Sequence, residues 1–228
     1  MLKSRSDALE IMDDLSISGP AIDQTLKELN IINRTLGGNA ISLSGFRKLI
    51  KNLPSFTLAD LGCGGGDIMK EMASWSRRGR KKGLFIGVDA NPHVIDYAKR
   101  NTVNFSEISY QSVNIFNREF KQQTFDIIHC CLFLHHFSKE DLIQLFRYFK
   151  KNARVGIIVN DLHRHPIAYW SISVLTRLFS KSSMVRHDAA VSVTKGFKRK
   201  ELIDILKQAG INNYKLNWRW AFRWKLIF

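Results

Sequence analysis

Residues 58–67 read Leu-Ala-Asp-Leu-Gly-Cys-Gly-Gly-Gly-Asp, and this stretch decides the fold class. It begins as an apolar segment interrupted by one carboxylate, Asp60, and continues into a turn that is almost entirely glycine. A helix-like stretch, residues 68–73, follows directly. The pattern is typical of a buried strand, a tight turn and a helix N-terminus, an arrangement that brings bare backbone N–H groups close to a ligand.

A second carboxylate lies at the end of the next apolar run. Residues 84–88 read Leu-Phe-Ile-Gly-Val and lead into Asp89. An acid placed roughly twenty residues beyond a glycine-rich turn is suited to accept hydrogen bonds from a ribose diol. The glycine turn and Asp89 together predict a nucleoside-containing cofactor bound to an α/β sheet.

The glycine spacing separates two classes of cofactor. Dinucleotide oxidoreductases need Gly-x-Gly-x-x-Gly/Ala, whose third small residue lets the helix pack closely on the strand. Gly62 and Gly64 match the first two positions, but Asp67 stands at the third. A carboxylate at a helix N-terminus repels a diphosphate and suits a cationic or zwitterionic ligand. The spacing therefore disfavours a dinucleotide-dependent oxidoreductase.

The run Asp-x-Gly-x-Gly-x-Gly that starts at Asp60 resembles motif I of the class I S-adenosylmethionine-dependent methyltransferases. Three later segments, residues 86–98, 113–116 and 125–136, resemble the same family in order and interval. The resemblance runs from about residue 56 to the C-terminus. It implies a Rossmann-like α/β fold, with a mostly parallel sheet and an antiparallel C-terminal strand.

The resemblance also implies a cofactor site. In this family the carboxylate before the first glycine helps to hold the methionine end of S-adenosylmethionine, and the later acid takes the ribose hydroxyls. The family usually has an acidic residue for the adenine amino group where this chain has Asn114, whose amide oxygen can accept the same hydrogen bond. The expected cofactor-binding residues are Asp60, Gly62, Cys63, Gly64, Gly66, Asp89, Ala90, Asn114, Ile115 and Cys130.

Length and cysteine usage limit the organisation of the chain. With 228 residues it is long enough for one α/β domain and a small cap. The three cysteines show no Cys-x-x-Cys spacing, so we expect neither a disulfide framework nor a metal site. No signal-peptide pattern and no apolar run long enough to cross a bilayer are apparent. These features predict a cytoplasmic protein.

The net charge of +15 leaves the partners open. Lys and Arg cluster at residues 77–82 and 195–200. Such charge can attract nucleic acid or an anionic membrane surface, and it can steer an acidic substrate. The alternative is that residues 77–82 form a solvated helix end, far from the cofactor. RNA and weak peripheral membrane contact therefore stay as secondary partners, behind a small-molecule acceptor.

Two parts of the chain are expected. Residues 1–55 form a helical cap, with an amphipathic helix over 21–36 and a shorter helical stretch over 45–53. This cap either shapes the acceptor pocket or simply packs on the sheet. Residues 56–228 form the cofactor-binding domain, with an acceptor-side insertion at 163–195.

Two apolar patterns lie in the C-terminal half. Residues 167–179 place Ile167, Trp170, Val174 and Leu178 on one helical face. Residues 218–224 alternate aromatic side chains with Arg or Ala, which predicts a strand with one aromatic face. The apolar helix and the N-terminal cap together predict a closed, apolar acceptor pocket.

Candidate catalytic residues follow the fourth and fifth strands. Methyl transfer requires a positioned nucleophile and, for a hydroxyl, a base that removes its proton. In open α/β sheets the reaction takes place beyond the carboxyl ends of the strands. His163, His135 and Asp161 lie there, and a histidine suits a phenol or an enol. His135 has a purely structural alternative, as part of a turn packed on the sheet.

The acceptor is the least determined feature. No Asn/Asp-Pro-Pro-Tyr/Phe motif follows the fourth strand, which argues against methylation of adenine N6 or glutamine. The chain is similar to bacterial methyltransferases of quinone and polyketide pathways. We therefore predict methyl transfer to a small phenolic or polyketide/lipid-like acceptor, to oxygen rather than carbon. An RNA methyltransferase and a non-catalytic cofactor-binding subunit are the alternatives, and the sequence leaves the oligomeric state open.

Overall fold

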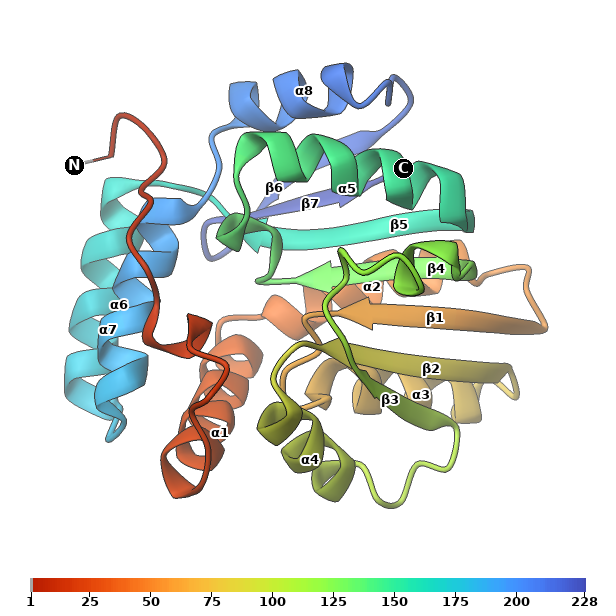
Figure 1. Ribbon diagram of the computed structural model, residues 1–228, viewed down its shortest axis with the longest axis horizontal. Coiled ribbons are helices and arrows are strands. Elements are labelled where there is room, and N and C mark those ends of the chain that lie inside the picture. Colours follow the sequence, from red (N-terminus) through yellow and green to blue (C-terminus); the bar gives the residue numbers. More distant parts are fainter. Residues whose placement is uncertain (1) are drawn as a thin grey trace.

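Seven strands form one sheet in the order β3-β2-β1-β4-β5-β7-β6 in the computed structural model, which describes residues 2–228 (Figure 1). The first five strands are parallel to one another, while β7 runs antiparallel to both β5 and β6. This is the expected Rossmann-like methyltransferase sheet with an antiparallel C-terminal end. The strands are β1 (Ser55–Leu61), β2 (Lys82–Asp89), β3 (Ile108–Ser112), β4 (Phe125–Cys131), β5 (Ala153–Leu162), β6 (Lys215–Arg219) and β7 (Arg223–Ile227).

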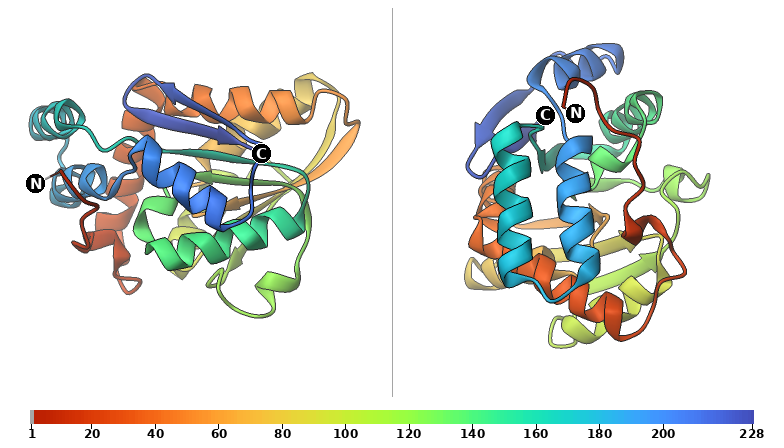
Figure 2. Two further views of the ribbon diagram at one scale, coloured as in Figure 1. Left: turned by 90° about the horizontal axis from the view of Figure 1, so that it is seen from above. Right: turned by 90° about the vertical axis from the view of Figure 1, so that its left-hand side faces the viewer.

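Helices cover both faces of the sheet, with α2 and α3 on one face and α5 and α8 on the other (Figure 2). Three short 3-10 turns, η1 (Ile11–Asp13), η2 (Phe120–Gln122) and η3 (Leu134–His136), complete the fold. The α-helices are α1 (Pro20–Thr35), α2 (Gly38–Leu49), α3 (Asp67–Arg78), α4 (Pro92–Asn101), α5 (Lys139–Asn152), α6 (Pro166–Phe179), α7 (Ser183–Lys195) and α8 (Arg199–Gln208).

Each face of the sheet has its own apolar core. Phe46 of α2 and Met72 of α3 are fully buried on one side, while Phe149 of α5 and Leu206 of α8 are fully buried on the other. The central strands are apolar on both faces because both faces are covered, as parallel sheets require. Helix packing on both faces holds the sheet in place. Because the first five strands are parallel, their carboxyl ends meet at one edge of the sheet.

The carboxyl ends of the parallel strands point toward a group of elements formed by the N-terminal segment, α1, α6 and α7 (Figures 1 and 2). Side chains tie this group together. Glu28 of α1 accepts hydrogen bonds from the backbone N–H of Lys181 and Ser182, between α6 and α7. Asp188 of α7 accepts from the backbone N–H of Ile11 and Met12. The N-terminal segment is thereby fastened across the end of the sheet.

Two local expectations differ from the structure, and the structure also shows what form the insertion takes. The second helix of the cap starts at Gly38 and not at 45, because Gly37 takes the left-handed conformation that separates it from α1. The insertion is a helical pair, with α7 antiparallel to α6 (Figure 1). Residues 218–224 do not form one strand, because the chain turns at residues 220–222 between β6 and β7. Among residues 2–228, the helices are all too short or too polar to cross a bilayer.

Candidate functional site

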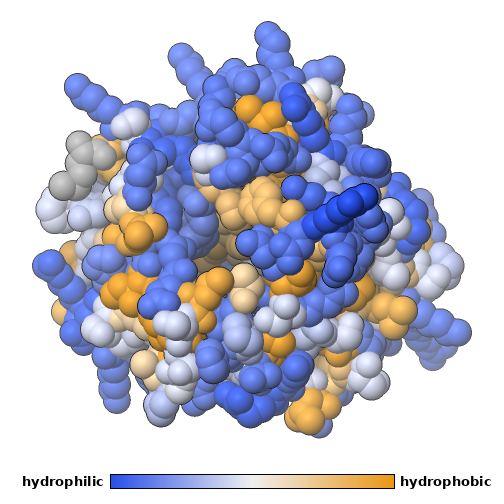
Figure 3. Space-filling view, in the orientation of Figure 1, coloured by the Kyte–Doolittle hydropathy of each residue, from blue (hydrophilic) through white to orange (hydrophobic). Residues whose placement is uncertain are grey.

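A cavity of about 660 Å³ lies at the carboxyl ends of the parallel strands. One part of its wall is the glycine turn after β1 together with residues 89–91 after β2. Another part is the segment 131–137 after β4, and the remainder comes from α1, α6, α7 and the hairpin turn at 220–223. Figure 3 shows the surface hollowed left of its centre, with apolar side chains at the border.

The glycine turn gives the cavity a wall of bare backbone. Gly62 and Gly64 adopt positive φ angles of 68° and 51°, which side chains other than glycine rarely tolerate. A Cβ on Gly62 would lie 2.2 Å from the Phe133 ring, whereas a Cβ on Gly64 would meet only Leu26, at 4.0 Å. The backbone at Gly64 therefore faces open space in which a ligand can approach it closely.

Two carboxylates stand on the same wall. Asp60 is buried, and its Oδ1 lies 2.6 Å from His129 Nδ1; the other ring nitrogen of His129 lies 2.9 Å from Ser42 Oγ. Asp89 accepts a hydrogen bond from the backbone N–H of Asn91 at 3.0 Å. Burial raises the pKa of Asp89, and backbone hydrogen bonds oppose that rise. A bare glycine wall between two fixed carboxylates fits a cationic amino acid moiety joined to a ribose diol, as in S-adenosylmethionine.

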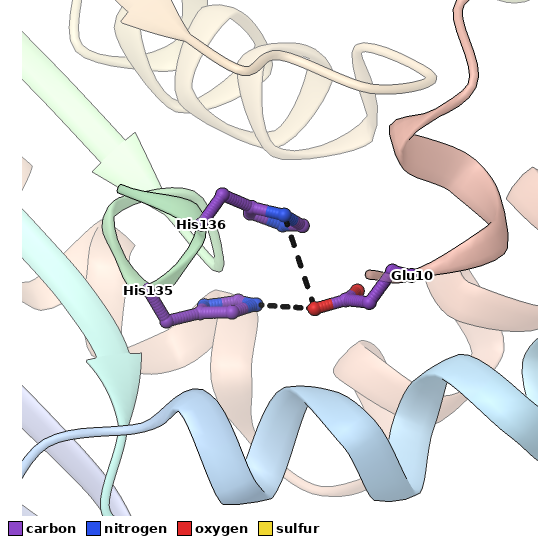
Figure 4. Close-up of side chains that lie close together, drawn as sticks. All are labelled: Glu10, His135 and His136. Atoms are coloured by element: carbon purple, nitrogen blue, oxygen red, sulfur yellow. Dashed lines mark ion pairs between the residues drawn. The ribbon is translucent and has the colours of Figure 1, made fainter. Parts of the chain in front are cut away.

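A cluster of acidic and basic side chains faces the cavity from the turn after β4. His135 Nδ1 lies 2.7 Å from Asp161 Oδ1, and its Nε2 lies 3.5 Å from Glu10 Oε1. Both rings of the His135-His136 pair point toward the Glu10 carboxylate of the N-terminal segment (Figure 4). His136 Nδ1 is 2.8 Å from Asp13 Oδ1. His135 is buried between the two carboxylates, with Nε2 free of any hydrogen bond within residues 2–228.

The charges of this cluster shift one another's pKa values. Burial by itself lowers the pKa of His135, but Asp161 and Glu10 outweigh burial and raise it to about 9. Burial raises the pKa of Glu10, yet His135, His136 and Lys195 bring it down to about 2. His135 is consequently an imidazolium at neutral pH, stabilised by two carboxylates.

Glu10, His135 and His136 also offer ligand atoms within 4.8 Å of one another, a spacing that suits a metal ion. The ammonium group of Lys195 lies 3.3 Å from Glu10 Oε1, and it already balances that carboxylate. His135 is itself cationic at neutral pH. Positive charge from the protein thus already balances the carboxylate that a metal ion would need, and the cluster is a network of charge pairs.

The remaining wall of the cavity is mostly apolar. Helix α1 contributes Leu29 and Ile32, and α6 contributes Ile172 and Leu175. This matches the apolar pocket expected between the cap and the helix at 167–179. Of the stripe predicted on that helix, only Ile167 borders the cavity, whereas Trp170 is 68% exposed, and Val174 and Leu178 are exposed as well. The cavity is lined by the neighbouring face of α6, because α7 packs against that side.

The sequence model of a methyltransferase domain matches residues 54–210. The chain belongs to this methyltransferase family. The matched segment contains the glycine turn, Asp89 and the His135-His136 pair. It therefore covers the part of the cavity wall that follows the parallel strands, and it leaves out α1 and the hairpin turn at 220–223. A comparison with curated protein sequences gave no match.

Solved structures show the same fold at low sequence identity. The human N-acetylserotonin methyltransferase, solved with S-adenosylmethionine, superimposes with a TM-score of 0.62 at 20% identity, over 90% of this chain and 55% of the human one. The plantazolicin methyltransferase BpumL, solved with S-adenosylhomocysteine, gives 0.66 at 15% identity, over 91% of this chain and 93% of that one. A methyltransferase from Aquifex aeolicus gives 0.61 at 16% identity, over 90% and 96% of the two chains. This methyltransferase therefore spans about half of the human enzyme and nearly all of the other two.

The structure gathers most of the expected cofactor residues of this methyltransferase at the cavity. Asp60, Gly62, Cys63, Gly64, Asp89 and Ala90 all border the cavity. The other four expected residues do not: Gly66, Asn114, Ile115 and Cys130 lie outside its lining. Gly66 precedes α3, and a Cβ there would lie 2.3 Å from the Tyr110 hydroxyl. Its glycine is thus required by packing.

Three of these residues have other roles in the methyltransferase. Asn114 is exposed, and its side chain accepts a hydrogen bond from the backbone N–H of Phe116 at 2.9 Å. Ile115 and Cys130 are buried in the apolar core against α5. Cys130 lies one residue before the end of β4, and the alternation of that strand points its side chain into the core.

His163, expected as a catalytic candidate, also lies outside the cavity. Its Nδ1 accepts a hydrogen bond from Trp218 Nε1 at 3.2 Å, and its ring centre lies 5.0 Å from that of Trp224. The backbone of His163 pairs with Phe197 just after β5, which directs the ring toward the C-terminal hairpin. His135, in contrast, borders the cavity, and Asp161 contacts it from the end of β5.

The basic cluster at 77–82 lies at the other end of the sheet. Arg77 forms an ion pair with Glu107, and Lys81 donates to the carbonyl oxygens of Lys51 and Leu53. These residues precede β2, whereas the cavity lies at its carboxyl end. The cluster therefore lies at the end of the sheet opposite the cavity, as the alternative of a helix end far from the cofactor predicted.

Sequence reasoning missed three residues of the site: Glu10, His129 and Arg223. Glu10 lies in an N-terminal segment without a regular pattern, and it meets His135 only through the fold. His129 reads as part of an apolar strand, although a histidine inside such a run is itself a signal of a buried polar partner. Arg223 occupies a polar position in the alternating pattern of residues 218–224, and such a position predicts an exposed side chain.

Proposed function

We propose that the chain transfers the methyl group of S-adenosylmethionine to an oxygen atom of a small phenolic or polyketide/lipid-like acceptor. The observation that supports this proposal is the buried pair Asp161–His135: His135 borders a mostly apolar cavity that also holds the cofactor wall, and its Nε2, 3.5 Å from Glu10 Oε1, makes no hydrogen bond within residues 2–228. A hydroxyl needs a base, and an apolar cavity favours a ligand of the same character.

When bound, S-adenosylmethionine supplies an electrophilic methyl group, so the protein has to orient the acceptor and remove its proton. In our proposal His135 Nε2 takes that proton. Asp161 binds Nδ1–H, so it fixes the tautomer and the ring orientation, and it stabilises the imidazolium that forms. Asp161 is a positioning residue, because it acts through His135.

The raised pKa of His135 determines when this base is available. At a pKa of about 9, most of the imidazole is already protonated at neutral pH and cannot accept a second proton. Glu10 is one of the two carboxylates that hold this proton. The neutral fraction increases about tenfold for each pH unit up to the pKa, so the proposed reaction accelerates under alkaline conditions.

Native mass spectrometry of the protein with S-adenosylmethionine and a panel of phenols and enols tests the proposal. A product heavier by one methyl group, attached to oxygen by NMR, is the expected result. Attachment to carbon or nitrogen would contradict the oxygen assignment while leaving the methyltransferase activity intact. Product formation by His135→Gln at the wild-type rate would contradict the assigned base.

A further inference from the structure

Arg223 is a buried guanidinium that forms no ion pair with any side chain of residues 2–228. It starts β7, is 3% exposed and borders the cavity. Its Nε and Nη1 have no hydrogen-bond partner among residues 2–228. The other buried arginine of the described chain, Arg164, pairs with Glu201 at 2.5 Å. A buried cation without a counter-charge is strongly unfavourable. A negatively charged ligand in the cavity would supply the partner that Arg223 lacks.

Within residues 2–228 no carboxylate forms an ion pair with Arg223, although Cys131 and Asp161 lie near enough to favour its charged form. Its nearest neighbours include Cys131, Gly38 and Asn33; a Cβ on Gly38 would lie 3.1 Å from the guanidinium carbon and 2.0 Å from Asn33 Oδ1. Burial raises the pKa of the Cys131 thiol to about 11, so this residue carries no charge at neutral pH. Burial lowers the pKa of Arg223, and the nearby Cys131 and Asp161 oppose that change.

The position of Arg223 indicates which ligand it serves. Its register partner is Leu162, so its side chain lies on the same sheet face as Asn160, near α2. Asp161 alternates to the opposite face, where it holds His135. The two polar ends of the cavity therefore stand on opposite faces of the sheet, with the apolar lining of α1 and α6 beside them.

The cofactor wall lies farther away in the sheet. The glycine turn follows β1, and the strand order places β4 and β5 between β1 and β7. Three strand spacings, roughly 14 Å, separate the backbones of β1 and β7, although the Arg223 side chain crosses part of this distance and lies near Cys131 at the end of β4. The acceptor end of the cavity, beyond β4 and β5, is therefore closer to the strand that carries Arg223 than the cofactor end is.

We propose that Arg223 binds a carboxylate group of the acceptor, so that the substrate is an apolar acid whose hydroxyl faces His135. This inference rests on the proposed function for the location of the acceptor. A guanidinium presents N–H donors in a fork that matches a carboxylate, and desolvation inside an apolar cavity strengthens such a pair. The carboxylate supplies the missing negative charge and the missing hydrogen-bond acceptors together.

Equilibrium binding tests the inference without requiring turnover. Isothermal titration with saturating S-adenosylhomocysteine compares 4-hydroxybenzoate and 6-hydroxy-2-naphthoate with their neutral amides. We expect the wild type to bind at least one acid about tenfold or more tightly than its amide. This preference disappears in Arg223→Gln and survives in part in Arg223→Lys. Arg219→Gln is the matched control, because Arg219 lies opposite Arg223 in the hairpin but is exposed.

A preference for the acid that persists in Arg223→Gln, or a wild type without any preference, would overturn the inference. The cofactor is the other source of a carboxylate. If Arg223→Gln weakens S-adenosylhomocysteine binding more than tenfold but leaves decarboxylated S-adenosylmethionine unaffected, Arg223 serves the cofactor and the acceptor assignment is wrong. If the protein methylates only neutral phenols, the inference that the acceptor is an acid is wrong, while the proposed function is still supported.

Thermal unfolding separates ligand binding from a structural role. Arg223→Met keeps the volume of the side chain and removes the buried charge. We expect a melting temperature equal to or above that of the wild type without ligand, and a smaller stabilisation by the acid probes. A melting temperature lowered by more than about 5 °C would show that Arg223 supports the fold and would overturn the inference.

Discussion

Asp161 Oδ1 lies 2.7 Å from His135 Nδ1, and this contact joins the end of β5 to the turn after β4. The other carboxylate oxygen of Asp161 accepts the backbone N–H of Leu134 at 2.8 Å. One side chain therefore sets both the conformation of the turn and the orientation of the histidine ring that the turn carries. The ring borders the cavity, and its other nitrogen, Nε2, points toward the Glu10 carboxylate at 3.5 Å.

Replacement of this histidine should separate chemistry from cofactor binding. We expect His135→Gln to lower kcat/KM by about 10²- to 10⁴-fold, because the acceptor proton loses its base. Binding of S-adenosylmethionine, measured by calorimetry, should change less than about threefold, since the cofactor wall is formed by other residues. His163→Gln is the matched control and should retain wild-type kcat/KM, because His163 lies outside the cavity. Equal losses in the two variants would contradict this assignment.

The pH dependence of the reaction should follow His135. A base with a pKa of about 9 is active only when neutral, so kcat/KM should rise with pH and level off above about 9. In Glu10→Gln the imidazolium loses one of its two carboxylates, its pKa falls, and the rising limb should move to lower pH. Initial rates between pH 6 and 10.5 would show this shift. A profile that is flat above pH 7 would be incompatible with His135 as the base.

The same residue should make stability depend on pH. Folding raises the pKa of His135 from 6.5 to about 9, so its contribution is complete below about pH 6.5 and is lost as the pH rises through 9. The difference corresponds to about 3 kcal/mol at most. Urea unfolding at pH 6.5 and 9.5 should therefore show a larger loss of unfolding free energy in the wild type than in His135→Gln. Parallel losses would disprove the linkage.

The glycine turn should not tolerate a side chain at Gly62. Gly62→Ala combines an unfavourable φ of 68° with a Cβ only 2.2 Å from the Phe133 ring. We expect it to lose at least tenfold in affinity for S-adenosylmethionine and several degrees in melting temperature. Gly37→Ala is the control: its φ of 75° is similar, but nothing lies within 4 Å of the added Cβ. Its effect therefore measures the unfavourable backbone conformation without a steric clash. If both variants bind the cofactor equally well, the close approach at Gly62 has no role in binding.

Much of the cofactor side could be predicted because its residues are close together in sequence. Asp60 and the glycines belong to one strand–turn–helix unit, and Asp89 ends the neighbouring strand. Local chemistry sufficed there, since a tight turn with positive φ needs glycine and a parallel pair brings both strand ends to one edge. Gly66 was assigned to the cofactor on the same pattern, although packing against Tyr110 explains it.

The acceptor side could not be predicted in the same way. Glu10 lies more than a hundred residues before both of its partners, His135 and Lys195. Nothing in the local sequence of these residues marks them as partners. His163 had as much local support as His135, but the backbone pairing after β5 turned its ring to the hairpin. The unpaired state of Arg223 is visible only when every neighbour is known.

The sequence by itself determined the sheet, the cofactor and the family, because periodicity and turn chemistry act over a few residues and strand ends meet by topology. Only the tertiary structure decided which histidine faces the cavity, which carboxylates raise its pKa and which arginine lacks a partner. Burial and electrostatic energies depend on distances between chain segments that are remote in sequence, so these properties arise when the N-terminal segment, α6, α7 and the hairpin close over the strand ends.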